Sequence, residues 1–88
     1  MPDRPTNIMP KVIPKLILYS KSGCGLCDKA KALLDSAQLE YTEIDILENK
    51  DAMALYAFEI PVLVDSKGQE LLKGEFTQSR VAALLMRL

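Results

Sequence analysis

The chain has 88 residues, with 11 basic and 12 acidic side chains, no histidine and a net charge of −1. This length allows one domain, and an apolar content of 49% is enough to fill a core, which excludes general disorder. The balanced charge argues against nucleic-acid binding, and the lack of histidine excludes Ser–His and Cys–His nucleophile pairs.

Residues 1–14 hold four of the five prolines, and we expect them to form a flexible, proline-rich tail outside the domain. A docking arm that uses the apolar residues of this segment is the alternative. The segment lacks the apolar centre of a secretory signal, and no apolar run approaches the roughly 18 residues of a membrane span. We therefore expect a cytoplasmic protein with no membrane partner. In that compartment a cysteine pair is more often catalytic or metal-binding than a structural disulfide.

The domain is expected to run from residue 15 to residue 88. The apolar run at residues 16–19 is typical of a strand buried on both faces. Residues 40–46 predict a second strand, and Glu48 and Asn49 can cap a short helix that ends near residue 57. Between these strands, apolar residues at helical spacing predict a helix with one buried face, formed by Leu26, Ala30, Leu33, Leu34 and Ala37.

The second half of the domain predicts a hairpin and a last helix. Residues 60–64 and 69–73 flank a glycine-containing turn, which is typical of two antiparallel strands. Thr77 can be the N-cap of the last helix, whose predicted apolar face is Val81, Leu84, Leu85 and Leu88. The order βαβαββα predicts an α/β fold with three layers, in which helices cover both faces of a four-stranded mixed sheet.

Cys24 and Cys27 lie where the first strand ends and the first helix begins. The first turn of a helix has unpaired N–H groups and about half a positive charge, which stabilise an anion. Because a thiolate is the attacking species in disulfide exchange, this position favours a reactive Cys24, and Lys21 is the nearest cation in sequence. At this spacing the sulfurs can form a disulfide, so Cys24 can attack a substrate disulfide and Cys27 can resolve the mixed disulfide. Gly25 leaves room for a substrate.

A structural disulfide, a metal site and two bystander cysteines are the alternatives to redox chemistry. A disulfide that closes a four-residue ring stabilises a fold by only about 2 kcal/mol. A zinc site usually has four ligands, whereas this chain has two cysteines and no histidine, so we predict no metal-binding residues. The position of the pair at a strand-to-helix turn favours redox chemistry.

Residues 18–27, Leu-Tyr-Ser-Lys-Ser-Gly-Cys-Gly-Leu-Cys, resemble the active-site segment of glutaredoxins in the thioredoxin superfamily. Those proteins have a lysine three residues before the nucleophilic cysteine, as Lys21 is here. Ile60-Pro61-Val62 resembles the second hallmark of the family, a cis-proline beside the cysteine pair. The pattern from Tyr56 to Leu71 is similar to that of small bacterial glutaredoxin-like proteins. The resemblance implies a thioredoxin-like fold, a cis Pro61, and an Ile60 whose backbone contacts the substrate.

The chain also departs from the family pattern. Gly25 and Leu26 stand where typical glutaredoxins have Pro-Tyr between the cysteines. Gly74 is followed by Glu75 and Phe76, where glutaredoxins have a Gly-Gly pair and an acidic residue that grip glutathione. We expect Glu75 to repel a glutathione carboxylate, and Leu26 and Phe76 to form an apolar lip for a protein substrate. The predicted substrate-binding residues are Gly25, Leu26, Ile60, Pro61 and Gly74.

The sequence therefore predicts a monomeric thiol–disulfide oxidoreductase of cell redox homeostasis, with Cys24, Cys27 and Lys21 as catalytic residues. The expected partners are a disulfide-containing protein or a glutathione mixed disulfide, and a thiol reductant. No bound cofactor is predicted, although glutathione is a possible co-substrate. One alternative is a [2Fe–2S] cluster shared by two subunits, because glutaredoxins with a small residue at the position of Gly25 sometimes hold one. The other is a redox-inactive thioredoxin-like binding module.

Overall fold

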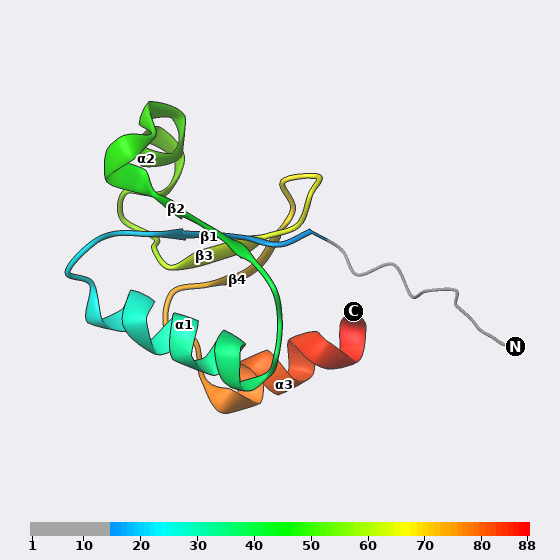
Figure 1. The fold of residues 1–88 in the computed structure, drawn as a ribbon. Coiled ribbons are helices and arrows are strands. Elements are labelled where there is room, and N and C mark those ends of the chain that lie inside the picture. Colours follow the sequence, from blue (N-terminus) through cyan, green and yellow to red (C-terminus); the bar gives the residue numbers. More distant parts are fainter. Residues whose placement is uncertain (1–14) are drawn as a thin grey trace, which may run out of the picture.

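The computed structural model describes residues 15–88, and the predicted flexible tail of residues 1–14 lies outside this part of the chain. The fold is a four-stranded sheet with helices on both faces (Figure 1). The strands and α-helices follow the predicted order, with one added 3-10 turn after the second strand. The elements are β1 Ile17–Ser20, α1 Gly25–Ser36, β2 Thr42–Asp45, η1 Ile46–Glu48, α2 Lys50–Tyr56, β3 Val62–Val64, β4 Glu70–Lys73 and α3 Gln78–Arg87.

The sheet has the strand order β2–β1–β3–β4 and contains both parallel and antiparallel pairs. Strands β1 and β2 are parallel, because α1 returns the chain to the edge at which β1 began. Strand β3 is antiparallel to both β1 and β4, which confirms the predicted hairpin. The mixed sheet and its helices confirm the predicted thioredoxin-like α/β fold class.

Three strands are shorter than predicted, and the last of these, β4, lacks only residue 69. The second was expected over residues 40–46 but covers only Thr42–Asp45, because the Asp45 side chain accepts a hydrogen bond from the Leu47 N–H and begins η1. The third was expected to begin at residue 60 but begins at Val62, since Pro61 has no N–H to donate to a neighbouring strand.

The core consists of two apolar clusters on opposite faces of the sheet, because successive residues of a strand point to opposite faces. Figure 1 shows α1 and α3 together on one side of the sheet and α2 on the other. The larger cluster lies against α1 and α3 and contains Leu16, Leu18, Ala30, Leu34, Leu63, Leu72, Phe76, Val81 and Leu84. The smaller cluster joins Tyr56 of α2 to Val62 and Val64 of β3.

The predicted apolar face of α1 is wrong at its first residue, and that of α3 is wrong at its last two. In α1, Leu26 is 43% exposed, and Cys27 takes its place on the buried face because Cys27 lies three residues before buried Ala30. In α3, Leu85 and Leu88 are partly exposed, since the end of this helix extends past its contacts with the core. None of the helices within residues 15–88 has the length and apolar composition that a bilayer crossing requires.

Candidate functional site

The sheet register brings three predicted site segments to one edge of the molecule. Ser20, at the end of β1, lies beside Asp45 at the end of β2, and Tyr19 lies beside Val62 at the start of β3. Val62 in turn lies beside Lys73 at the end of β4. The cysteine pair follows β1, Pro61 precedes β3 and Gly74 follows β4. The register therefore places the predicted substrate-binding residues Gly25, Leu26, Ile60, Pro61 and Gly74 at the same edge as the two cysteines.

Cys24 is the N-cap of α1, with extended backbone angles of φ −98° and ψ 113°. Its sulfur accepts a hydrogen bond from the Cys27 N–H at 3.2 Å, and its own N–H donates to the Lys21 carbonyl oxygen at 3.3 Å. Both cysteines are free thiols, of which Cys24 is partly exposed and Cys27 is completely buried. The sulfur of Cys24 is therefore reachable and lies at the positive end of the helix dipole.

Cys27 is buried, and its surroundings keep its thiol protonated. Burial raises the pKa of Cys27 from 9.0 to about 12, and its hydrogen bond to Cys24 and the charge of Cys24 act in the same direction. The backbone of Lys21 and, to a smaller extent, the charge of Lys31 act in the opposite direction. Cys27 is therefore a neutral thiol near pH 7, next to a partner sulfur that meets solvent.

Two serines before Cys24 form hydrogen bonds to the neighbouring strand β2: Ser20 at the end of β1 and Ser22 in the loop that follows. Ser20, which is 1% exposed, donates from its hydroxyl to Glu43 Oε2 at 2.6 Å. Ser22 donates from its hydroxyl to Asp45 Oδ2 at 2.8 Å. The sequence analysis missed these contacts. The sequence does contain a signal for them. The two serines are two residues apart, the two acids are also two residues apart, and the strands β1 and β2 pair in the fold.

Lys21 is exposed, and its charge acts on Asp45 across the same loop. The pKa of Asp45 lies below its ordinary value, first because the Leu47 N–H donates to this carboxylate, then because Ser22 does, with a smaller effect of Lys21. The structure therefore places the charge of Lys21 near an acid of the neighbouring strand. The predicted catalytic role of Lys21 stays a prediction.

The two segments at the same sheet edge as the cysteines are joined to each other. The Ile60–Pro61 peptide bond is cis, the form that the family resemblance implied, and Pro61 is fully buried. The Gly74 N–H donates to the Pro61 carbonyl oxygen at 3.0 Å, and Gly74 has φ +81°, which favours glycine. Ile60 is half-buried against the smaller cluster. A Cβ added to Gly25 would meet no atom within 4 Å, so the space above the start of α1 is open.

The expected apolar lip of Leu26 and Phe76 is wrong. Phe76 is completely buried in the larger cluster, because its side chain fills the space between the sheet and α3, whereas Leu26 is exposed. Glu75 forms an ion pair with Lys29 of α1, with 2.7 Å between Oε2 and Nζ. This contact holds the pKa of Glu75 below its ordinary value. The charge that was expected to repel glutathione is thus paired with a cation.

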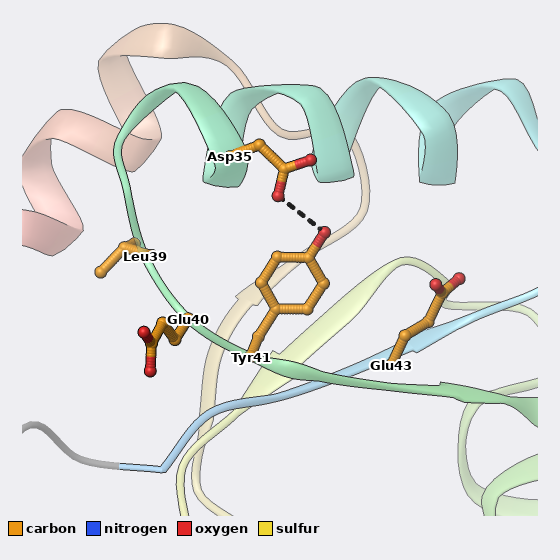
Figure 2. Close-up of a pocket in the computed structure, with 5 residues that line it drawn as sticks. All are labelled: Asp35, Leu39, Glu40, Tyr41 and Glu43. Atoms are coloured by element: carbon orange, nitrogen blue, oxygen red, sulfur yellow. Dashed lines mark hydrogen bonds between the residues drawn. The ribbon is translucent and has the colours of Figure 1, made fainter.

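A hollow in the surface lies away from the cysteines, at the other end of α1. Its volume is about 600 Å³. Figure 2 shows the residues that line it, among which the Tyr41 hydroxyl donates to Asp35 Oδ1 at 3.1 Å. The cavity is lined by Asp35, Leu39, Glu40, Tyr41 and Glu43. Within residues 15–88, no group of three or more histidine, cysteine or acidic side chains is arranged to hold a metal ion. The cysteine pair is therefore the candidate site.

Three comparisons with known proteins agree with this geometry. The family model described as Glutaredoxin-like domain (DUF836) matches residues 15–86. The structure of protein XcR50 from X. campestris is 31% identical, with a TM-score of 0.73, over 83% of this chain and 97% of that one. Glutaredoxin 1 of Rickettsia bellii is 40% identical over 40 residues, which are 46% of this chain and only 41% of that protein. Thioredoxin 1 of Thermosipho africanus shares the fold, with 21% identity and a TM-score of 0.55 over 83% of this chain and 91% of that one.

Proposed function

Because the chain belongs to the glutaredoxin-like domain family (DUF836) of the thioredoxin superfamily, we propose that it is a thiol–disulfide oxidoreductase. In this proposal Cys24 is the nucleophile and Cys27 is the resolving thiol. One observation supports the assignment above all others. Cys24 is partly exposed at the start of α1, whereas Cys27 is buried, protonated and hydrogen-bonded to it.

The first half of the reaction uses Cys24 alone. The Cys24 thiolate attacks one sulfur of a substrate disulfide and forms a mixed disulfide, while the second substrate sulfur leaves as a thiolate and takes up a proton. The α1 dipole and the Cys27 N–H favour negative charge on the attacking sulfur. The open space above Gly25 gives the substrate room to approach.

The second half of the reaction uses Cys27. After losing its proton to solvent, the Cys27 sulfur attacks Cys24 Sγ, the bond between Cys24 and the substrate breaks, and the substrate leaves as its second thiolate. Two of the causes that raise the pKa of Cys27, its hydrogen bond to Cys24 and the charge of Cys24, end once Cys24 is bonded to substrate. Formation of the mixed disulfide therefore eases deprotonation of Cys27. Two electrons have passed to the substrate, and a thiol reductant restores the dithiol.

Protein disulfides are the substrate class that we propose. Leu26 presents an exposed apolar side chain next to the nucleophile, and Ile60, Pro61 and Gly74 lie at the same sheet edge. Backbone groups of this edge suit the main chain of an extended polypeptide. Lys29 forms an ion pair with Glu75, so its charge is not free to bind a glutathione carboxylate.

The proposal is tested by incubating the protein in glutathione redox buffers and mapping its disulfides by mass spectrometry. We expect the wild type to cycle between a dithiol and a 24–27 disulfide, and to reduce insulin in preference to a glutathione mixed disulfide. Cys27→Ser should accumulate a mixed disulfide through Cys24, whereas Cys24→Ser should be inactive. If no 24–27 disulfide forms in any of the buffers, the oxidoreductase assignment is wrong.

A further inference from the structure

Asp45 connects three parts of the candidate site. It ends β2, its Oδ2 accepts from the Ser22 hydroxyl at 2.8 Å and its Oδ1 accepts from the Leu47 N–H at 2.9 Å. Ser22 lies in the turn that is closed by the hydrogen bond from the Cys24 N–H to the Lys21 carbonyl oxygen. Since the ends of such a turn are less than about 7 Å apart, the Asp45 carboxylate lies on the order of 10 Å from the Cys24 sulfur. That separation is comparable with the screening length at physiological ionic strength.

Most other charges near this edge are paired, so they largely cancel one another at Cys24. Three ion pairs account for them: Lys29 with Glu75, Lys31 with Glu43 and Lys73 with Glu59. Asp28, in the first turn of α1, also lies 3.6 Å from Lys31, so the charges of this loop and strand end that remain are Lys21 and Asp45. Cys27 is neutral near pH 7. Lys21 and the helix dipole attract negative charge at the Cys24 sulfur, whereas the Asp45 carboxylate repels it.

We propose that Asp45 is a positioning residue that holds the nucleophile loop through Ser22 and, by its negative charge, limits the thiolate reactivity of Cys24. Asp45 thus has two effects that differ in kind. Its hydrogen bonds order the loop, and its charge opposes the charge of the reactive sulfur. The role in turnover rests on the oxidoreductase function proposed above, but the effect on Cys24 can be measured without turnover.

The chain contains a matched control for removal of this charge. Asp65 also caps a turn through its Oδ1, which accepts from the N–H groups of Lys67 and Gln69 at 2.8 and 2.9 Å. It lies in the β3–β4 hairpin, at the opposite end of the sheet from Pro61. Asp45→Asn and Asp65→Asn each keep a side-chain oxygen for the N–H groups and remove one negative charge. They differ in their distance from Cys24, and Asp45→Asn also loses the oxygen that accepts from the Ser22 hydroxyl, a loss that Ser22→Ala reproduces with the charge kept.

The test is the rate constant for alkylation of Cys24 by iodoacetamide at pH 7, measured on the reduced protein by peptide mapping. At low ionic strength we expect Asp45→Asn to raise this rate about twofold, the effect of one unit charge on the order of 10 Å away in a well-solvated site. The increase should shrink in 1 M salt. Asp65→Asn should leave the rate unchanged. Ser22→Ala, which keeps the charge and removes the hydrogen bond, should not raise it.

A second readout is the reduction potential of the 24–27 disulfide, which Asp45→Asn should make more oxidising because the reduced form is stabilised. An unchanged or slower alkylation in Asp45→Asn overturns the proposal, as does an equal increase in Asp65→Asn or Ser22→Ala. If the wild type forms no disulfide, the oxidoreductase function fails, while the alkylation rates still decide the role of Asp45.

Discussion

Two identical side chains three residues apart have opposite environments in this protein. Cys24 precedes the first turn of α1 and meets solvent, whereas Cys27 lies on the helix face that packs against the sheet. Burial and the hydrogen bond to Cys24 keep the proton on Cys27. At the scale of single residues, the different environments of the two cysteines, on which their proposed roles rest, therefore follow from where the axis of α1 lies relative to the core.

The buried thiol predicts an alkaline limit to the stability of the reduced protein. The pKa of Cys27 is about 12 in the folded chain and 9.0 ordinarily, so the unfolded chain releases this proton first as the pH rises. The contribution to stability is complete below pH 9 and is lost between pH 9 and 12. Urea midpoints measured from pH 7 to 10.5 under reducing conditions should fall more steeply for the wild type than for Cys27→Ala. Equal slopes in the two proteins would contradict the buried, protonated thiol.

At the scale of elements, each α-helix begins with a side chain that accepts one of its free N–H groups. The acceptors are Cys24 in α1, Asn49 in α2 and Thr77 in α3, of which the sequence analysis predicted the last two as caps. In α1 the cap is the proposed nucleophile itself, so the group that starts the helix is also the reactive group.

The cap of α3 gives a test at the element scale. Thr77 Oγ1 accepts from the Arg80 N–H at 3.1 Å, and replacement by alanine leaves that donor to solvent alone. Thr77→Ala should lower the free energy of unfolding by about 1 kcal/mol, whereas Thr77→Ser should keep most of it. Urea denaturation followed by circular dichroism measures both. A serine variant as unstable as the alanine variant would show that the hydroxyl is not the stabilising group.

At the scale of the whole molecule, the sheet separates two apolar clusters of unequal size. The larger cluster lies against α1 and α3, and the smaller cluster lies on the α2 side, where the Tyr19 and Tyr56 rings are 4.8 Å apart. The reactive edge of the sheet depends on both clusters, because β1 and β3 contribute side chains to each. Most of the stability should come from the larger cluster.

The two phenylalanines of the chain test this distribution. Phe76 is completely buried in the larger cluster, whereas Phe58, in the segment before Pro61, is fully exposed. Phe76→Ala should cost about 3–5 kcal/mol of unfolding free energy, and Phe58→Ala should change it by less than about 0.5 kcal/mol. Phe76→Leu keeps most of the buried volume and allows the measurement if the alanine variant does not fold. Similar urea midpoints for the two alanine variants would contradict the assignment of the core.

The chain by itself determined the order of elements, the caps Asn49 and Thr77, and the place of the cysteine pair at a strand-to-helix turn. These features depend on residues three or four positions apart, which a local pattern records. Only the tertiary structure decided that Cys27 is buried and Leu26 is not, because that choice depends on how α1 sits on the sheet.

The same holds for the contacts that surround the nucleophile. Ser22 meets Asp45 across 23 positions of sequence, and Lys29 meets Glu75 across 46. Each pair forms because the strand register brings remote segments to one edge, and no local pattern carries that register. The nucleophile could therefore be predicted from its neighbours in the chain, whereas the charges that tune it become visible only once the sheet is assembled.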